Sequence, residues 1–417
     1  MKKGKNHGRL EIRIEFEQID AFCKKNVRLN PHHENAKMNT RYGTYLAGIL
    51  SLLLGCLACQ KVLAEQNRQS NTIIKNLHNI KGKGILFGHQ DDLAYGMHWR
   101  YVDGQSDVKS VTGDYPAIFG WELGGVELDK PYNIDKVPFN AITTLAIWGH
   151  HKGGINTFSW HPSSAIDKSV DSWTNNVSVV KHLIPGGSYH EAFKRQLNRV
   201  ADFFSTLKDD QGHDIPFIFR PWHEMDGTWF WWGTKTCTPE ELKALFRFTV
   251  EYLRKTKGLS QMVVAYSPDR NFNNEEEFLT WYPGDDVVDI LGMDNYEDFK
   301  QENGVSEVIR KLHIVIKLAK AKGVLAALTE TGCSNMTNSL WFTQKLGIVL
   351  NDPIIKKELS YAMVWRNAPK VHFFFPYPGH QAAADAKIFT DQDHILLLNG
   401  YKMTINRLVN SPPLGKK

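Results

Sequence analysis

From about residue 70 onward, the chain alternates short apolar segments with longer segments in which apolar residues recur at helical spacing. The short segments are apolar almost throughout, which is typical of parallel strands that are buried on both faces. Eight of them occur, at residues 84–89, 117–123, 155–161, 216–220, 262–267, 288–293, 324–329 and 359–365. The pattern therefore predicts an α/β fold with eight strands.

The longer segments predict the helices that connect these strands, and the clearest span residues 190–207, 240–255 and 305–322. The last of these carries the i, i+3, i+4, i+7 apolar pattern from Val305 to Leu312, and Gly323 follows where a helix is expected to end. Eight strand–helix repeats without a low-complexity break favour a single (β/α)8 TIM barrel over residues 70–417. An open doubly wound sheet would need a glycine-rich turn after an early strand, whereas the glycine-rich residues 81–84 precede theirs.

The first 59 residues have the pattern of a leader. Their apolar stretch, residues 45–59, is shorter than the roughly 20 residues of a membrane-spanning helix and fits the apolar region of a signal peptide. We expect this signal peptide to start at Met38 and to end in a bacterial lipobox whose last residue, Cys56, is lipidated. Cys59 is a second candidate, and residues 60–69 form a short linker. This leader predicts export to the bacterial cell envelope, as an outer-membrane lipoprotein or in the periplasm.

The formal net charge of +5 comes from the leader. It holds ten Lys and Arg against five Asp and Glu, so the remaining residues carry 40 of each sign. A nucleic-acid-binding domain is expected to carry its positive charge on the folded domain, so this class is disfavoured. Cys237 and Cys333 are isolated in the sequence, which leaves open whether they pair.

In TIM barrels, the active site lies at the carboxyl ends of the strands. Side chains suited to catalysis or binding stand at these ends: His89, Gln90, Asp91, Glu122, His161, His223, Glu224, Asp269, Asp294, Tyr296, Glu330 and Arg366. Glu224 and Glu330 are the leading candidates, because two carboxyls across a barrel mouth are what glycosidic bond hydrolysis requires. One carboxyl must be protonated to donate to the leaving oxygen, and the other must be ionised to attack or to activate water.

Aromatic residues cluster around the first of these carboxyls. Residues 229–232 read Trp-Phe-Trp-Trp, and Trp160 and Trp222 lie nearby in the predicted fold. We expect their flat faces to stack against sugar rings, although packing in the core is the alternative.

Other kinds of site have weaker support. His89, His161 and His223 at three strand ends could bind a metal, but no bridging Lys or Asp pattern accompanies them. Neither an H-E-x-x-H motif nor a G-x-S-x-G motif is present.

At these motifs the sequence resembles glycoside hydrolase family 26, whose best-known members are β-mannanases. The resemblance runs from residues 88–96 (GHQDDLAYG) to 364–367 (VWRN), and it is most specific at 222–232 (WHEMDGTWFWW). It is especially close to the mannanases of Bacteroides-type gut bacteria. The resemblance implies a (β/α)8 fold, retention of anomeric configuration, and no cofactor or metal.

The resemblance also implies roles for individual residues. Glu224 matches the acid/base and Glu330 the nucleophile. The residues that match substrate-binding positions are His161, His223, Trp229, Asp294, Tyr296, Trp365 and Arg366. The sequence thus predicts a monomeric retaining endo-β-1,4-mannanase that acts on mannan, galactomannan or glucomannan.

Three alternatives stay open. The same mechanism could act on β-1,3-xylan or mixed-linkage β-glucan, or the protein could be a glycan-binding lipoprotein without catalysis. Release of mannobiose from a chain end, instead of internal cleavage, depends on how far segments 99–113 and 163–188 close the cleft.

Overall fold

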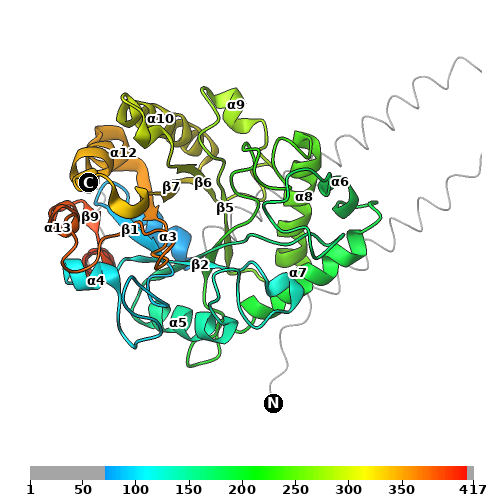
Figure 1. The fold of residues 1–417 in the computed structure, drawn as a ribbon, viewed down its shortest axis with the longest axis horizontal. Helices are drawn as coiled ribbons and strands as arrows, with labels where there is room; N and C mark the ends of the chain where they lie inside the picture. Colours follow the sequence, from blue (N-terminus) through cyan, green and yellow to red (C-terminus); the bar gives the residue numbers. More distant parts are fainter. Residues whose placement is uncertain (1–70, 411–417) are drawn as a thin grey trace, which may run out of the picture. The chain divides into compact units, whose positions relative to one another are not determined.

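The structure is a computed structural model that describes residues 71–410, so the predicted leader, the lipobox and the whole linker lie outside the described residues. Eight parallel strands form a closed ring (Figure 1), which confirms the predicted (β/α)8 TIM barrel. These strands are β1 (Ile85–Gln90), β2 (Ile118–Glu122), β3 (Ile155–Ser159), β4 (Phe217–Arg220), β5 (Met262–Tyr266), β6 (Ile290–Asn295), β7 (Leu325–Thr331) and β8 (Leu359–Val364). Each overlaps a segment predicted from the apolar pattern.

The ring closes where β1 pairs with both β2 and β8. A further short strand, β9 (Ile395–Leu396), also pairs with the start of β1, with Ile85 opposite Ile395. Since β8 occupies one edge of β1, β9 and β2 share the other edge. The pairing with β2 begins only at Gly88.

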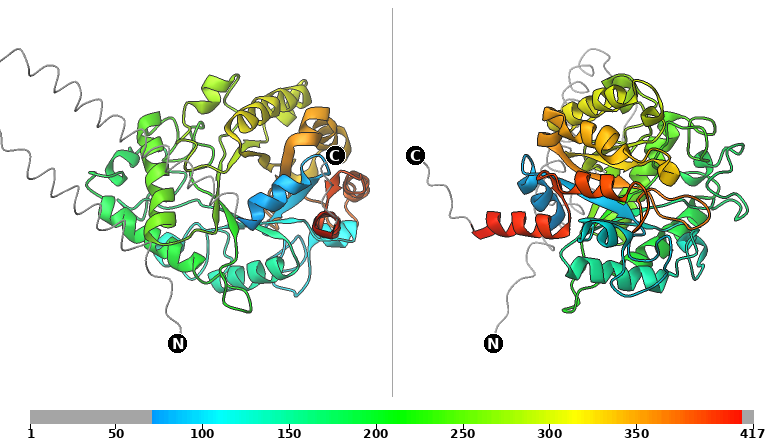
Figure 2. Two further views of the ribbon diagram at one scale, coloured as in Figure 1. Left: turned by 180° about the vertical axis from the view of Figure 1, so that it is seen from behind. Right: turned by 60° about the vertical axis from the view of Figure 1, so that its left-hand side comes forward.

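Helices surround the ring on its outer face, as Figure 1 shows for α5, α7, α8 and α10. The helices are α3 (Thr72–Ile80), α4 (Asp107–Thr112), α5 (Phe139–His151), α6 (Val180–Leu183), α7 (His190–Phe204), α8 (Pro239–Glu251), α9 (Glu275–Leu279), α10 (Gly304–Lys322), α11 (Gly347–Asn351), α12 (Pro353–Glu358), α13 (Ala383–Thr390) and α14 (Leu398–Asn410). Short helical turns are η1 (Val126–Leu128), η2 (Tyr252–Thr256), η3 (Asp298–Lys300), η4 (Ser334–Met336) and η5 (Phe342–Leu346). The C-terminal helix α14 contacts α3, and both lie toward the same end of the barrel (Figure 2).

Local sequence signals explain where the main helices begin and end. The side chain of Thr238 accepts a hydrogen bond from the Glu241 N–H and Glu241 bonds back, so α8 begins with a capping box. Helix α10 ends at Gly323, which has a φ of 66°. Only glycine adopts this left-handed conformation at little cost, so the predicted end of this helix is confirmed.

The core has two parts because strand side chains alternate between the two faces of the ring. Ile85 and Phe87 point outward into the larger cluster beneath the helices. Leu86 belongs to a second cluster, which residues from the strands share with α3. This cluster fills the barrel toward the amino ends of the strands. The polar side chains suited to catalysis lie at the opposite end, where the strands finish.

Two isolated features complete the fold. Cys237 and Cys333 are both free, so they do not pair with each other. None of the helices in residues 71–410 is long and apolar enough to cross a membrane.

Candidate active site

A cavity of about 480 Å³ lies at the carboxyl ends of the strands. Its walls come from the strands and loops β3 to β8: His161, Trp173, Glu224, Trp229, Phe230, Asp269, Arg270, Asn271, Tyr296, Glu297, Lys300, Glu330, Gly332, Ser334, Trp365, His372 and Phe374. Both predicted catalytic carboxyls therefore line one cavity. Of the seven predicted substrate-binding residues, His161, Trp229, Tyr296 and Trp365 line it, whereas His223, Asp294 and Arg366 lie behind its walls.

Glu224 stands on a tight turn just after β4. Its φ of 53° is unusual for a residue with a side chain, and its backbone N–H donates to the carbonyl oxygen of Ser267 at 2.8 Å. The indole nitrogen of Trp229 donates to Glu224 Oε2 at 2.6 Å. Burial raises the pKa of Glu224 well above its usual range, and the negative charge of Glu330 raises this pKa further. Glu224 therefore keeps its proton at a pH where an ordinary glutamate has lost it.

Glu330 lies near the end of β7 and has the opposite surroundings. The hydroxyl group of Tyr296 donates to Glu330 Oε1 at 2.7 Å, and Arg220 Nη2 forms an ion pair with Oε2. Burial and the charge of Glu330 raise the pKa of Tyr296 well above its usual range, so the phenol remains a donor. Two donors on two different oxygens fix the orientation of this carboxylate.

Arg220, the last residue of β4, joins the predicted nucleophile to a second carboxylate. Its guanidinium is fully buried and forms ion pairs with both Glu330 and Asp294. The hydroxyl group of Ser267 donates to Asp294 Oδ1 at 2.7 Å. Burial opposes the charged form of Arg220, yet the two carboxylates outweigh it and raise its pKa. Asp294 thus positions Arg220 from inside the barrel.

Sequence patterns placed Asp294 and Glu330 beyond their strands, and this was wrong. Both lie within strands, and they are register partners across β6 and β7. The register shifts between Met293 and Asp294, so β7 carries one extra residue at this point. Such a bulge redirects a side chain, and here Asp294 and Glu330 both reach Arg220.

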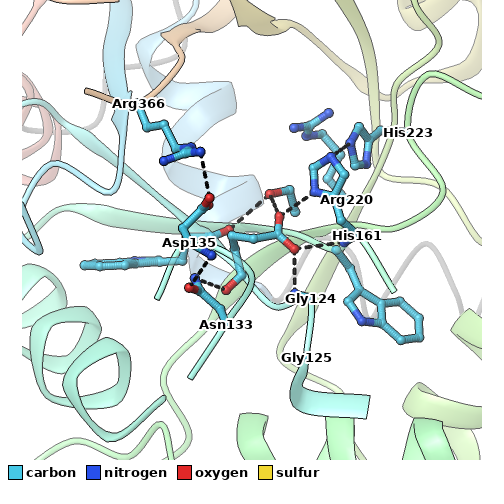
Figure 3. Close-up of polar contacts among 12 residues, drawn as sticks. Gly124, Gly125, Asn133, Asp135, His161, Arg220, His223 and Arg366 are labelled. Atoms are coloured by element: carbon cyan, nitrogen blue, oxygen red, sulfur yellow. Dashed lines mark hydrogen bonds and ion pairs between the residues drawn. The ribbon is translucent and has the colours of Figure 1, made fainter. Parts of the chain in front are cut away.

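His161 follows β3, and its ring is held from behind by Glu122 at the end of β2. Glu122 Oε2 contacts His161 Nδ1 at 2.8 Å, and Oε1 accepts the backbone N–H groups of His161 and Gly124 (Figure 3). Burial alone raises the pKa of Glu122, but the charge and hydrogen bonds of His161 outweigh it and lower this pKa to about 2. The far nitrogen, His161 Nε2, meets His223 Nε2 at 3.1 Å. His223 is buried, and its contact with Nε2 helps to hold the His161 ring in position.

Arg366 is held at the back of the site (Figure 3). Its Nη2 pairs with Asp135 Oδ1 at 2.7 Å, and its Nη1 donates to the hydroxyl oxygen of Tyr95 at 3.1 Å. That hydroxyl in turn donates to Asp91 Oδ2 at 2.6 Å. The guanidinium therefore joins the segments that follow β1, β2 and β8.

The aromatic cluster divides between the cavity and the core. Trp160, Trp222, Trp231 and Trp232 are buried, so the expectation that they stack against sugar was wrong for them. Trp231 donates to the carbonyl oxygen of Pro162 and Trp232 to that of His223, and these bonds fasten the loops of the site. Trp229 and Phe230 do line the cavity.

The structure adds Trp173, which the sequence analysis did not single out. It is 52% exposed, lines the cavity and stacks on His161 with ring centroids 5.3 Å apart and an interplanar angle of 11°. A tryptophan in a long loop does not belong to a helical or strand pattern, so the sequence alone offered no reason to select it. Its place in the cavity and its stacking on His161 make it a candidate surface for a sugar ring.

The three histidines considered for a metal do not come together. His89 Nδ1 pairs with Asp92 at 2.7 Å, whereas His161 and His223 contact each other. Within residues 71–410, no three His, Cys, Asp or Glu side chains are grouped as a metal site.

Comparison with known proteins agrees with this geometry. The sequence profile of glycosyl hydrolase family 26 matches residues 62–365. A mannan endo-1,4-beta-mannosidase from Bifidobacterium adolescentis is 31% identical over 360 residues, which cover 79% of this chain and 34% of that protein. An enzyme of the same name from Bacillus subtilis is 30% identical over 219 residues, which cover 50% of this chain and 57% of that protein. The chain thus spans about a third to a little over half of the length of these relatives.

Solved structures match over more of their length. A GH26 β-mannanase from Bacteroides ovatus is 41% identical with a TM-score of 0.73, and the match covers 78% of this chain and 94% of that one. The catalytic domain of an endo-β-1,4-mannanase from Bacillus sp. JAMB-750 is 34% identical with a TM-score of 0.73, covering 80% and 92%. With a profile match across most of the sequence and a barrel that places two glutamates in one cavity, the chain belongs to glycosyl hydrolase family 26.

Proposed function

We propose that the protein is a retaining endo-β-1,4-mannanase that cleaves mannan, galactomannan or glucomannan. The observation that carries this proposal is the contrast between two carboxyls in one cavity. Glu224 is held protonated by burial and by neighbouring negative charge, whereas Glu330 is oriented by a guanidinium and a phenol. A double displacement needs this division of roles. The mannanases among its relatives support the choice of substrate.

In the first step, Glu330 attacks the anomeric carbon and forms a covalent glycosyl ester. Glu224 gives its proton to the departing glycosidic oxygen, so the leaving sugar is released as a neutral alcohol. In the second step, Glu224 removes a proton from water, and the resulting oxygen attacks the anomeric carbon and displaces Glu330. Two inversions give net retention of configuration. Tyr296 and Arg220 keep the nucleophile aimed throughout.

Substitution of each carboxyl tests these roles. Glu330→Ala should abolish turnover of mannan, because no covalent intermediate can form. Glu224→Ala should lose hydrolysis of the polysaccharide but keep the first step on an aryl β-mannobioside, whose leaving group needs no proton. Reducing-sugar assays and stopped-flow release of nitrophenol measure the two reactions. Unchanged turnover of mannan by either variant would refute the role of that residue.

Substrate identity is tested with the wild-type enzyme. Reducing-sugar assays on mannan, glucomannan, lichenan and β-1,3-xylan should show the highest kcat/KM on mannan or glucomannan. Dominant activity on lichenan or xylan would replace the mannanase assignment while keeping the mechanism. Binding without product formation would indicate a glycan-binding protein.

We propose further that the protein is exported to the bacterial cell envelope with a lipid on Cys56. The support is the apolar segment 45–59 with its lipobox pattern. In a Cys56→Ser variant, the enzyme should move from the membrane fraction to the soluble fraction. Retention of this variant in the membrane fraction would point to Cys59 or to another means of attachment.

A further inference from the structure

The cavity has two halves of different chemistry. In the ring order, β4 carries Glu224 and β7 carries Glu330, so β5 and β6 separate them on one side and β8, β1, β2 and β3 on the other. The second side contributes rings, among them His161, Trp173 and Trp365. The first side contributes mainly polar groups from the β5 and β6 loops, namely Asp269, Arg270, Asn271, Glu297 and Lys300.

Both halves reach solvent. Asn271, Glu297 and Lys300 are exposed in the polar half, and Trp173 is exposed in the aromatic half. Behind the aromatic half, Arg366 is tied to Asp135 and Tyr95. In a double displacement, the leaving sugar must depart and water must enter while the other sugar remains on the nucleophile. The polar half is fastened to the turn of Glu224, which gives its proton to the leaving oxygen, so this half suits the leaving sugar and the aromatic half suits the sugar that stays.

Within the polar half, Asp269 lies on a loop that is hydrogen-bonded to the turn of the proton donor, Glu224. Its backbone N–H donates to Asp226 Oδ1 at 2.6 Å, and the Asn271 N–H donates to Asp226 Oδ2 at 3.0 Å. Asp226 lies two residues after Glu224, so it fastens the Asp269 loop to the turn that carries the acid/base. The two carboxyls are close enough to interact, because the charged form of Asp269 raises the pKa of Glu224.

The side chain of Asp269 is nearly covered, yet it lines the cavity. It is 7% exposed. Its carboxyl accepts a long hydrogen bond, 3.4 Å from Asn271 Nδ2 to Oδ2, and interacts with the Arg270 backbone N–H. A carboxyl has about four acceptor positions, so capacity remains toward the cavity. Burial and the charge of Asp226 raise the pKa of Asp269 to about 8, so at neutral pH it can both donate and accept a hydrogen bond.

We propose that Asp269 binds a hydroxyl group of the sugar on the leaving-group side of the cleaved bond. It is then a specificity-determining residue, which favours substrates that carry a sugar beyond that bond. This inference rests on the proposed mannanase function and extends it to one subsite.

Two substrates distinguish this role. Mannopentaose has sugars on both sides of its cleaved bond, whereas 4-nitrophenyl β-mannobioside has an aromatic leaving group without sugar hydroxyls. For Asp269→Ala, kcat/KM on mannopentaose should fall by about 10- to 100-fold, which is the effect of leaving a buried hydrogen-bonding group unpaired. On the aryl mannobioside, kcat/KM should stay within about twofold of wild type, because the nitrophenyl group has no sugar hydroxyl for Asp269 to bind. Asp269→Leu fills the same space without polar atoms and should behave like Asp269→Ala.

Two further variants complete the design. Asp269→Asn keeps a donor and an acceptor, so it should retain most of the activity on mannopentaose. Asp210→Asn is the matched control, because Asp210 is exposed on the loop between α7 and β4, at the other end of the barrel. It should match wild type on both substrates.

The outcomes separate cleanly. Equal losses on both substrates in the Ala and Leu variants would overturn the inference, since Asp269 would then act on Glu224 or on the fold. No loss on either substrate would also overturn it, as would an Asp269→Asn variant as impaired as Asp269→Ala. If Asp269→Ala does not fold, as judged by its melting transition, the Leu variant decides. A wild-type enzyme that cleaves neither substrate would contradict the proposed function instead.

Discussion

At the scale of single residues, two glutamates acquire different chemistry from their neighbours. Glu224 is buried and faces other carboxyls, and these surroundings favour its neutral form. Glu330 faces a guanidinium and a phenol. Arg220 is central to this contrast, because it is the buried cation shared by Glu330 and Asp294.

Substitution of Arg220 should therefore affect both stability and catalysis. Arg220→Met leaves two buried carboxylates unpaired, which should lower the free energy of unfolding by about 3–5 kcal/mol. It should also lower kcat by roughly 100-fold or more, because the nucleophile loses one of its two fixed donors. Arg220→Lys should recover only part of each loss, since an ammonium group cannot bridge two carboxylates as a guanidinium does. Chemical denaturation and steady-state kinetics measure the two effects.

The control for these variants is Arg195→Met, because Arg195 is exposed on α7. It should match wild type in both assays. If the Arg220→Met variant kept the wild-type kcat, Arg220 would be a structural residue without a part in aiming the nucleophile.

At the scale of elements, the site depends on loops that are fastened by buried polar side chains. The clearest case follows β8, where Asn367 organises the loop that carries His372 and Phe374. Asn367 Oδ1 accepts the backbone N–H groups of Phe374 and Phe375 at 2.9 and 3.0 Å, and its Nδ2 donates to Asp107 Oδ2 at 2.7 Å. The cavity wall is therefore held by hydrogen bonds from a residue outside the cavity.

Removing this support predicts a split effect. Asn367→Ala leaves two buried N–H groups without their acceptor, so the free energy of unfolding should fall by about 2–4 kcal/mol. Because Phe374 contributes to the wall of the cavity, KM for mannan should rise several-fold while Glu224 and Glu330 stay in place. Equilibrium denaturation and initial-rate kinetics provide the measurements. A lower kcat at unchanged KM would show that the loop acts on the chemical step instead.

Elements were easier to predict than the details of the site. The eight strands are visible in the sequence because both of their faces are buried, and the end of α10 because glycine favours its conformation. The bulge beside Asp294 has no signature in the pattern of apolar residues. The ends of β6 and β7 are polar, so the pattern did not predict that these strands continue past residues 293 and 329. Arg220 was noted only as the end of a strand, since its two partners lie 74 and 110 residues away. Trp229 and Trp232 are the same residue type in one aromatic run, so only packing shows that the first lines the cavity and the second lies in the core.

At the scale of the whole molecule, the site imposes a cost on stability. The pKa of Glu224 is raised in the folded state, so the native protein binds this proton more tightly than the unfolded chain does. As pH rises above the unfolded value of about 4.3, the unfolded chain releases the proton more readily and the native state loses stability. The carboxyl that performs catalysis therefore lowers stability at neutral pH.

Glu224→Gln should reveal this cost. At pH 7, the variant should melt above wild type, by about 2–4 °C for each kcal/mol recovered. The difference should shrink toward zero near pH 4, where the glutamate is protonated in both states. Calorimetry at the two pH values measures it, and Glu240→Gln, on the first turn of α8, is the control. A difference that is constant with pH would mean that the gain does not come from ionisation.

The closure of the ring by β1 and β8 has a consequence for how the enzyme is made. These strands lie at opposite ends of the barrel sequence, and Leu86 pairs with Tyr361 across the seam. During translation, the ring cannot close until residues 359–364 have left the ribosome. Contacts so distant in sequence form late. The nascent polypeptide thus contains both glutamates well before the barrel is complete. Its hydrolytic activity should therefore appear only once β8 has joined the ring.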